Sequence, residues 1–403
     1  MATTPPFIPG ASRPVTGSAP DIRRTRRSEL AIWWREIDRV LLALVLVLMA
    51  IGTLAVAVAS PASAQRLSTA HVRLDDLHFL VLHVRWQVLG MITMFAASLL
   101  PRDMARRAGI VLGFAMLAAL ILVPVVGTSV NGAKRWLNLG ISLQPSEFMK
   151  PAFAIVLAWI LSWRLRDPRL PVMAVATGLM ALIGVLLMAQ PDFGSTVLFV
   201  GVWFVMMFQS GLSVRRIAAA AGFGIFGMAA AYMFYGNARH RIDAFLGGGT
   251  AFDQVDIAKH TLLAGGWTGT GLWLGVHKLS LPEAHTDYIF SVIGEEGGLI
   301  ACTVIVLLYF AIIFRVLIRL VKEEDLFTVL AATGLVAQLG GQAFINILVN
   351  LQLFPSKGMT LPLISYGGSS TIALCLGVGF LLAITRRNPF LSRDPFSRIG
   401  ARR

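Results

Sequence analysis

The sequence predicts an all-α polytopic membrane protein with about ten transmembrane helices, and three observations support this fold class. Of its 403 residues, 56% are hydrophobic and only 14% are charged, whereas a soluble domain has about 25% charged residues. The apolar runs are long and mostly unbroken, so they meet the helical criterion of about 20 residues rather than the alternating pattern of a β-barrel. Lys and Arg gather between alternate runs, as in loops on the cytoplasmic side of a membrane.

The first apolar run, 40–59, follows a basic segment rich in Pro, Ser and Thr. Because such a composition cannot form a core, residues 1–38 are predicted to be a disordered cytoplasmic tail. The sequence Ala62-Ser63-Ala64 after the run resembles a signal-peptidase site, but the apolar region of a signal peptide is only about 7–15 residues long. We therefore interpret the run as an uncleaved first transmembrane helix.

Further apolar runs predict the remaining transmembrane helices. They cover residues 78–100, 108–127, 147–163, 171–189, 194–210, 216–236, 286–314, 326–350 and 362–385. With the N-terminus inside, the basic connections and the tail from Arg386 fall on one side, so both termini are expected in the cytoplasm. Topology then explains most of the 35 Lys and Arg residues and the net charge of +14, and a role in nucleic-acid binding loses its main support.

The expected organisation is one membrane domain, 39–386, followed by a cytoplasmic tail, 387–403. A large outer loop, 237–286, separates the seventh and eighth helices, and loops of this length are usually functional or disordered. The outer segment 351–370 is rich in Gly, Ser and Pro. This composition indicates irregular backbone, which at membrane depth must line a polar cavity or be buried in protein.

Two features of other functional classes are excluded by their context. The glycines of 265–275 have no preceding strand and no following Lys-Ser/Thr pair, so they do not form a nucleotide-binding phosphate loop. Cys302 and Cys375 both lie inside apolar runs. They show no metal-ligand spacing, and we interpret them as small core residues.

Asp287 stands where a polar outer loop turns into the eighth apolar run. Pro282 suits the first turn of a helix, and acids just after it are favoured by the helix dipole. Asp287 and Glu283 therefore have a purely structural explanation. A carboxylate at hydrocarbon depth is costly and usually functional, so Asp287 is also a candidate proton acceptor. The local sequence leaves both interpretations open.

Glu147 and Lys150 have the i, i+3 spacing that places them on one face of a helix, which Ser146 can cap. They either neutralise each other at the membrane edge or line a hydrated cavity in which Lys150 holds an anionic headgroup and Glu147 orients it. Asp192 follows Pro191 between two apolar runs. This pattern favours a tight turn in which Asp192 caps the next helix.

Two further groups of charged residues have alternative interpretations. Arg241, in the Arg-His-Arg sequence 239–241, belongs either to a solvated charge run or to an outer phosphate site. Glu295 lies eight residues after Asp287 and therefore about 80° around a helix, so it is the carboxylate that can approach the same cavity. Glu296 is about 180° around the helix and is expected to need a partner on another helix.

The order of four outer motifs resembles the FtsW/RodA family, the SEDS glycosyltransferases of bacterial cell-wall synthesis. The matching stretches are 134–150, 191–194, 281–290 and 355–370, and the likeness covers about residues 40–388. Residues 283–287 and 356–365 are closer to the division branch of the family. Two departures, Trp273 in place of a usual glycine and Asp256-Ile257 in place of a Tyr-Gln pair, leave the path of the large loop open.

The resemblance implies polymerisation of lipid II, a polyprenyl-diphosphate disaccharide-pentapeptide, into glycan strands at the outer face of the cytoplasmic membrane, at the division septum. Asp287 takes the position of the family's essential aspartate and is expected to act as the general base. The diphosphate leaving group needs cations rather than a second acid. Their expected sources are Lys150, Lys357, Arg241 or a divalent cation, Mg²⁺ or Mn²⁺.

The resemblance also assigns supporting residues and partners. Glu147 and Ser365 are expected beside the diphosphate, with His285, Glu295 and Asp192 in support. The expected partners are a class B penicillin-binding protein, which is the septal transpeptidase, and other divisome proteins. A lipid flippase or transporter and a non-catalytic scaffold are the alternative functions. A transporter's site is expected near the membrane midplane, whereas the motifs here gather at one surface.

Overall fold

The computed structural model describes residues 30–68, 73–130, 133–138, 142–165, 167, 169–190, 192–211, 254–355 and 358–387, with the isolated positions 215, 222 and 233. The chain divides into a unit of residues 38–386 and a terminal unit of 1–37 with 387–403. In the terminal unit, residues 30–36 are helical, and the N–H of Arg387 donates to the C=O of Glu36 over 3.3 Å. The described end of the predicted N-terminal tail is therefore helical.

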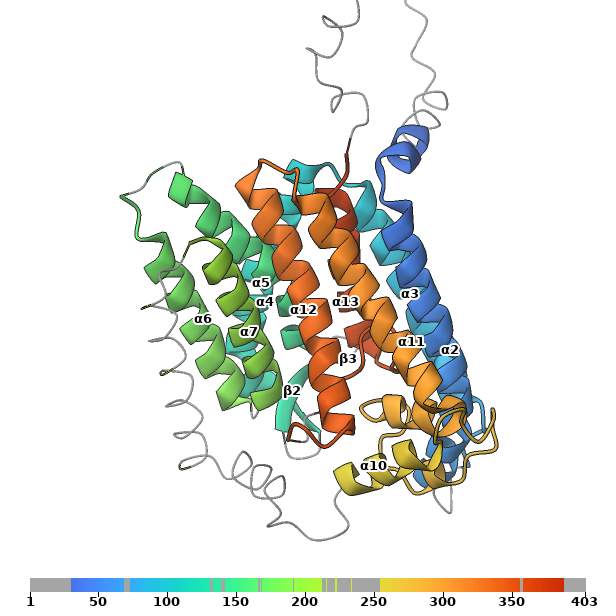
Figure 1. The fold of residues 1–403 in the computed structure, drawn as a ribbon. Helices are drawn as coiled ribbons and strands as arrows, with labels where there is room; N and C mark the ends of the chain where they lie inside the picture. The colour runs from blue at the N-terminus through green and yellow to red at the C-terminus, as the bar shows by residue number, and fades with distance from the viewer. Residues whose placement is uncertain are drawn as a thin grey trace, which may run out of the picture. The chain divides into compact units, whose positions relative to one another are not determined.

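The larger unit is a bundle of apolar helices (Figure 1). Of the described helices, seven are long and apolar enough to cross a membrane. They are α2 (Arg39–Leu67), α3 (His78–Leu99), α4 (Arg102–Val126), α5 (Pro145–Ser162), α6 (Val172–Ala189), α11 (Ile289–Leu320) and α12 (Leu326–Asn350). The shorter apolar helices are α7 (Phe193–Gln209) and α13 (Gly368–Ile384).

Each of these helices overlaps a predicted transmembrane segment, so the all-α membrane fold is confirmed. The predicted span 216–236 and the first part of the large loop, 237–253, lie outside the continuously described ranges. α2 continues to Leu67, beyond the predicted end of the first span. Residues 62–64, the sequence that resembles a cleavage site, are buried within this helix, in agreement with an intact first span.

Segment 128–143, for which no strand was predicted, contains three short strands. β1 (Thr128–Val130), β2 (Ala133–Asn138) and β3 (Ser142–Leu143) form an antiparallel sheet in the order β1-β2-β3. These strands are too short to show the alternation of apolar and polar residues that identifies a strand. The described part of the large loop contains α10 (Gln254–Ala264) and the 3₁₀ turn η3 (His277–Leu279).

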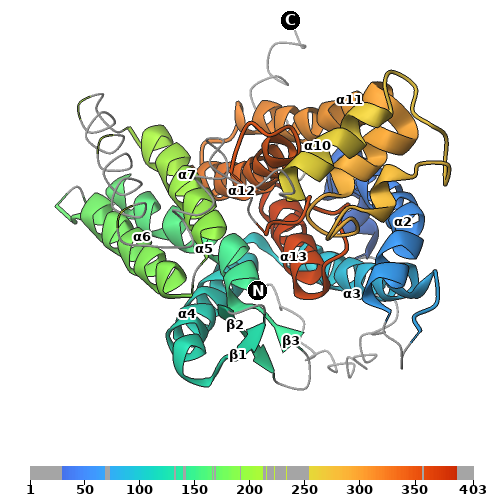
Figure 2. The same cartoon turned by 90° about the horizontal axis from the view of Figure 1, so that it is seen from below.

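α12 occupies the middle of this bundle. It contacts α5, α7, α11 and α13, and Figures 1 and 2 show it among these helices from two directions. In its apolar window 72% of the residues are buried, against 22% in α4. Polar side chains on α12 must therefore find their partners inside the protein, because little of this helix faces outward.

The first residue of the bundle is held by a buried ion pair. Asp38 caps α2 by accepting from the N–H groups of Val40 and Leu41, both over 3.1 Å. Its carboxylate also pairs with Arg315 at 2.9 Å and Arg319 at 2.7 Å, both near the end of α11. Burial by itself would raise the pKa of Asp38, but hydrogen bonds from Arg315 and Leu41 and the charge of Arg319 hold that pKa below its usual value.

Candidate functional site

α11 is broken at Gly298, and segment 265–271 hydrogen-bonds to the break. Gly298 has φ 67° and ψ −169°, a backbone conformation that is accessible to glycine but strained for other residues. The N–H groups of Thr270 and Gly271 donate to the C=O groups of Glu295 and Glu296 over 2.9 and 3.1 Å. On the other side of the break, Leu299 and Ile300 donate to the C=O groups of residues 266 and 267. The segment therefore satisfies backbone groups that the broken helix leaves open.

The carboxylates of Glu295 and Glu296 hold the next part of the same outer segment. Glu295 accepts from the N–H groups of His277 and Lys278 over 2.7 and 2.9 Å. Glu296 pairs with the ammonium of Lys278 and accepts from the N–H of Gly275 over 3.2 Å. Glu296 was expected to need a partner on another helix, and its partner, Lys278, lies on the short 3₁₀ helix η3. Both carboxylates hold the backbone of residues 275–278 in place. A supporting role of Glu295 beside Asp287 stays a prediction.

Residues 358–367 form an irregular segment that enters the bundle. The hydroxyl of Tyr309, well inside α11, donates to the C=O of Pro362. A Cβ added at Gly52, in the middle of α2, would lie only 2.7 Å from Cα of Ile364. The predicted irregular backbone is confirmed, and it is buried in protein against α2 and α11. α13 consequently begins at Gly368 rather than at the predicted residue 362.

Three amide side chains on one face of α12 fasten this segment and the Asp287 segment. The amide of Gln342 donates to the C=O of Thr360 over 2.9 Å. Asn346 donates to the C=O groups of Met359 and Asp287 over 2.7 and 2.8 Å. Asn350 donates to the same C=O of Asp287 over 3.2 Å. Gln342, Asn346 and Asn350, called the α12 amide ladder below, therefore fix two segments that are about 70 residues apart in sequence.

Asp287 lies in the irregular segment 281–288, before α11 begins at Ile289. The interpretation of Pro282 as a first-turn residue is therefore wrong, because the helix starts seven residues later. The helix N-cap is Tyr288, which makes no side-chain cap hydrogen bond. Asp287 is half-buried, and a Cβ added at Gly358 would lie 3.4 Å from its Oδ2. Its carboxylate thus stands beside the start of the buried segment.

Ser365 and His285 join the two segments directly. The hydroxyl of Ser365 donates to the C=O of Thr286 over 2.6 Å and accepts from the N–H of Leu361 over 2.8 Å. The N–H of Tyr366 donates to the C=O of His285 over 2.9 Å. Ser365 therefore uses its hydroxyl for structure, and its expected contact with substrate stays a prediction.

The ring of His285 is buried between two aromatic side chains. Its centroid lies 4.2 Å from that of Phe79 and 5.3 Å from that of Tyr366. Burial lowers the pKa of His285 to about 4, and the nearby Glu283 carboxylate only partly opposes this shift. Among the described residues its Nδ1 has no hydrogen-bond partner. His285 is thus a neutral ring that packs between α3 and the segment after Pro362.

Glu147 and Lys150 form the predicted pair on α5, with Nζ of Lys150 2.7 Å from Oε1 of Glu147. Lys150 is only 2% exposed and also donates to the amide oxygen of Gln342 over 3.1 Å. The pair is thereby connected to the α12 amide ladder. Ser146 does not cap the helix, because α5 begins at Pro145 with Gln144 as its N-cap.

The remaining predicted site residues lie elsewhere. Asp192 caps α7 by accepting from the N–H of Ser195 over 3.2 Å, which confirms the structural interpretation. Lys357 and Arg241 lie outside the described residues. Within the described ranges no group of three or more His, Cys, Asp or Glu side chains is arranged to hold a metal ion. The described part of the site thus offers no ready set of ligands for Mg²⁺ or Mn²⁺.

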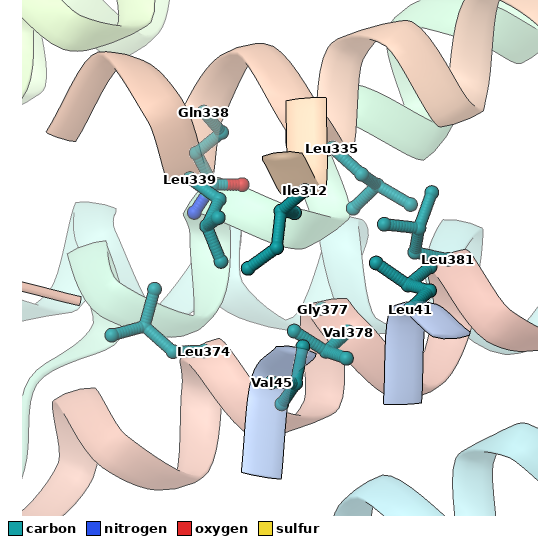
Figure 3. A pocket seen from close by; sticks show the side chains of 10 residues that line it. All are labelled: Leu41, Val45, Ile312, Leu335, Gln338, Leu339, Leu374, Gly377, Val378 and Leu381. Atoms are coloured by element: carbon teal, nitrogen blue, oxygen red, sulfur yellow. The ribbon is translucent and has the colours of Figure 1, made fainter. Parts of the chain in front are cut away.

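The amide ladder is the element that the sequence analysis missed. Gln338, Gln342, Asn346 and Asn350 recur every four residues in an otherwise apolar run, so they share one helix face. Gln338 is the polar residue lining a small apolar cavity of about 10 Å³ between α2, α11, α12 and α13 (Figure 3). This volume holds about one water molecule. The cavity is therefore no substrate site.

The broken helix, the buried irregular segment and the polar network at one end of an apolar bundle define a multi-pass helical membrane protein with a preorganised site. The family model FTSW_RODA_SPOVE, described as "Cell cycle protein", matches residues 38–389. The chain therefore belongs to the FtsW/RodA/SpoVE family, as its outer motifs had indicated.

Similar proteins agree with this assignment. The chain is 37% identical to "Probable peptidoglycan glycosyltransferase FtsW" of Caulobacter vibrioides, over 91% of this chain and 93% of the relative. It is also 37% identical to the protein of the same name from Thioalkalivibrio sulfidiphilus, over 92% and 95% of the two chains.

Two solved structures share the fold. A chain from "Structural coordination of polymerization and crosslinking by a peptidoglycan synthase complex" has a TM-score of 0.72 and 27% identity, with 89% of this chain and 99% of that chain covered. Rod shape determining protein RodA of Thermus thermophilus has a TM-score of 0.64 and 27% identity, with 87% and 97% covered.

Proposed function

We propose that this protein is a peptidoglycan glycosyltransferase that polymerises lipid II into glycan strands, with Asp287 as the general base. One observation carries the proposal: the structure fixes the backbone of Asp287, the residue that the motif resemblance assigns as the family's essential aspartate, from two sides. Asn346 and Asn350 hold its C=O, and the hydroxyl of Ser365 holds the C=O of Thr286. A general base needs such fixed placement to reach the proton it removes.

The proposed step balances with a single carboxylate. The acceptor sugar hydroxyl attacks the anomeric carbon of the donor, and a new glycosidic C–O bond forms. The bond from that carbon to the diphosphate breaks, and the diphosphate leaves with the electron pair. The hydroxyl proton passes to the carboxylate of Asp287. Since diphosphate is a stable anion, the site needs positive charge near it rather than a second acid.

Lys357, Lys150 and Arg241 are the proposed cations for the diphosphate. Gly358 lies beside the Asp287 carboxylate, and Lys357 is its neighbour in the sequence. The ammonium of Lys150 is occupied by Glu147 and Gln342. For Lys150 to bind the diphosphate directly, it has to exchange one of these partners for a phosphate oxygen.

The proposed setting is the outer face of the cytoplasmic membrane at the division septum. Both termini are then cytoplasmic, and ten transmembrane helices complete the bundle. The proposed partners are a class B penicillin-binding protein and other divisome proteins. This setting is supported by the relatives named FtsW and by the similar chain from a peptidoglycan synthase complex.

The test is glycan synthesis by the full chain, purified with its transpeptidase partner and supplied with lipid II. Asp287→Asn keeps the size of the side chain and removes its basicity, so we expect loss of glycan strands with an unchanged melting temperature. Glu283→Gln is the matched control, because Glu283 is exposed on the same segment and its carboxylate accepts a hydrogen bond from the hydroxyl of Thr286, which an amide oxygen can also accept.

Three outcomes distinguish the possible functions. Loss of strands in Asp287→Asn but not in Glu283→Gln supports the glycosyltransferase. Normal strand formation by Asp287→Asn removes Asp287 from the mechanism. If the wild type forms no strands but supports septum assembly, or moves lipid II across vesicles, the protein is a scaffold or a transporter.

A further inference from the structure

The large outer loop contains a long stretch without charge. Residues 261–276 include no Asp, Glu, Lys or Arg, although this stretch lies outside the membrane-spanning helices. Six of its apolar side chains are more than half exposed, and they are Leu263 63%, Trp267 74%, Leu272 52%, Trp273 52%, Leu274 69% and Val276 65%. Contiguous exposed apolar side chains mark a surface that contacts something other than water.

The backbone at the tip of this stretch is strained. Trp273 has φ 66°, a left-handed conformation that costs a bulky residue about 1–2 kcal/mol. The side chain of Trp273 is half exposed, so contacts within the protein cover only part of it. Trp273 is both strained and half exposed. These two features are expected of a residue that also contacts something outside the chain.

The exposed stretch continues the apolar surface of α11. The N–H of Ile300 donates to the C=O of Trp267 over 3.2 Å, so the two segments lie side by side. Ile300 itself is 57% exposed. Further along α11, Leu307 and Phe310 are also largely exposed. In a multi-pass membrane protein an exposed apolar helix face of this kind contacts lipid.

The length of α11 places the stretch at the membrane boundary. From Gly298 the helix continues to Leu320, a rise of about 33 Å at 1.5 Å per residue. The hydrocarbon core of a bilayer is about 30 Å thick. If the far end of α11 lies at one boundary of the core, Gly298 and the attached 265–271 segment lie at the other.

We propose that residues 263–276 lie in the interfacial layer of the bilayer beside α11, with Leu272, Trp273 and Leu274 inserted among the lipid acyl chains. The partner is the lipid of the same membrane, because the stretch is continuous with the lipid-facing surface of α11. Tryptophan is enriched at this depth, where its ring is apolar and its N–H meets the headgroups. The exposed Lys259, His260 and His277 flank the stretch and stay at the headgroups.

The experiment measures the depth of Leu274 in vesicles. The full chain with Leu274→Cys, in a background of Cys302→Ala and Cys375→Ala, is labelled with an environment-sensitive fluorophore. It is then reconstituted in phosphatidylcholine vesicles without any other protein. Lys134→Cys, exposed on β2, is the water-facing control, and Phe310→Cys, 62% exposed on α11, is the lipid-facing control.

We expect the label at Leu274 to emit at shorter wavelength than the label at Lys134. Lipids that carry a quencher near the headgroup should quench it more strongly than aqueous iodide. The label at Phe310 should be quenched best by a quencher deeper in the acyl chain. Trp267→Cys, placed in the same stretch, repeats the measurement at a second site.

The proposal is overturned if the labels at Leu274 and Trp267 behave like the label at Lys134. It is also overturned if their emission shifts only after the transpeptidase is added, since the stretch is then a protein-binding surface. Because the readout is depth and not glycan synthesis, it is independent of whether Asp287 is the general base.

Discussion

Two bulky residues with left-handed backbone show how differently segments 358–367 and 265–280 are stabilised. Leu363, in the segment that enters the bundle, has φ 64° and is 3% exposed. Trp273, in the large outer loop, has φ 66° and is 52% exposed. The backbone strain is about 1–2 kcal/mol in each case. Burial of a leucine contributes about 1.5–3 kcal/mol, so contacts within the protein offset the strain at Leu363, whereas half of the Trp273 side chain has no such contacts.

The two segments are also fastened by different groups. Neutral amides of α12 donate to carbonyl groups of the 358–367 segment. Carboxylates and backbone carbonyls of α11 accept from N–H groups of the 265–280 segment. The first arrangement places a segment inside the bundle beside Asp287. The second holds a segment at the edge, where its apolar side chains face outward.

The largest effect is expected for Asn346→Ala. This change leaves the C=O of Met359 without its donor and the C=O of Asp287 with Asn350 alone, which costs about 2 kcal/mol in the free energy of unfolding. A shift of Asp287 by about 1 Å should lower kcat of glycan synthesis by about 100-fold, with a smaller change in KM. Steady-state kinetics and thermal unfolding measure both effects. Gln338→Ala, on the same helix face, is the control and should leave kcat near the wild-type value.

The second-largest expected effect is a pH dependence of the free energy of unfolding, caused by His285. Folding lowers the pKa of His285 from 6.5 to about 4, so the unfolded state binds its proton more tightly. The neutral His285 ring makes its full contribution to the free energy of unfolding above about pH 6.5. As the pH falls to 4, about 2–3 kcal/mol of this free energy is lost. His285→Phe keeps an aromatic ring between Phe79 and Tyr366 and does not titrate.

Thermal unfolding between pH 7 and pH 4 measures this dependence. The wild-type melting temperature should fall more steeply with decreasing pH than that of His285→Phe. The Glu283 carboxylate opposes the lowering of the His285 pKa. The melting temperature of Glu283→Gln should therefore fall more steeply with decreasing pH than that of the wild type. Parallel curves for wild type and His285→Phe would contradict the assignment.

Leu363→Gly and Trp273→Gly test the comparison of the two strained residues most directly. Leu363→Gly removes a buried side chain at a cost of about 4 kcal/mol and relieves about 1–2 kcal/mol of strain. We expect a net destabilisation of about 2 kcal/mol. Chemical denaturation in detergent measures it.

Trp273→Gly is expected to have the smallest effect. In detergent the relief of about 1–2 kcal/mol of strain is offset by the loss of the contacts that cover about half of the indole, so the free energy of unfolding should change by less than about 1 kcal/mol. In lipid vesicles the variant should be less stable than the wild type, because it also loses the contacts of the indole with lipid. An equal loss of stability in Leu363→Gly and Trp273→Gly would remove the distinction between the two segments.

Long apolar runs made most of the fold predictable from the sequence, and the nine described apolar helices fall where those runs lie. The capping role of Asp192 and the Glu147–Lys150 pair followed from local spacing. Local spacing also misled at Pro282, because the chain turns through 281–288 before α11 begins. That turn depends on Asn346 and Asn350, which lie about 60 residues later in the chain.

The site was less predictable because its groups meet only through the fold. Gln342, Asn346 and Asn350 show a clear four-residue spacing, but in a long apolar run such residues usually fill a helix interface. Which carbonyl groups they bind depends on where the 358–367 segment enters the bundle. The family resemblance identified Trp273 as a residue at a position where the family usually has glycine. The structure gives a reason for that glycine, because the backbone at this position has φ 66°, which glycine adopts without strain.

The ion pair of Asp38 bears on the order in which the chain can acquire its structure during synthesis. Its partner Arg315 follows 277 residues later. At a translation rate of about 5–20 residues per second, Asp38 waits about 15–55 s for that guanidinium. During this time α2 is in place without the buried contact that fixes its first residue. The first residue of the bundle is therefore fixed only when α11 is complete, which makes this contact a late event in biogenesis.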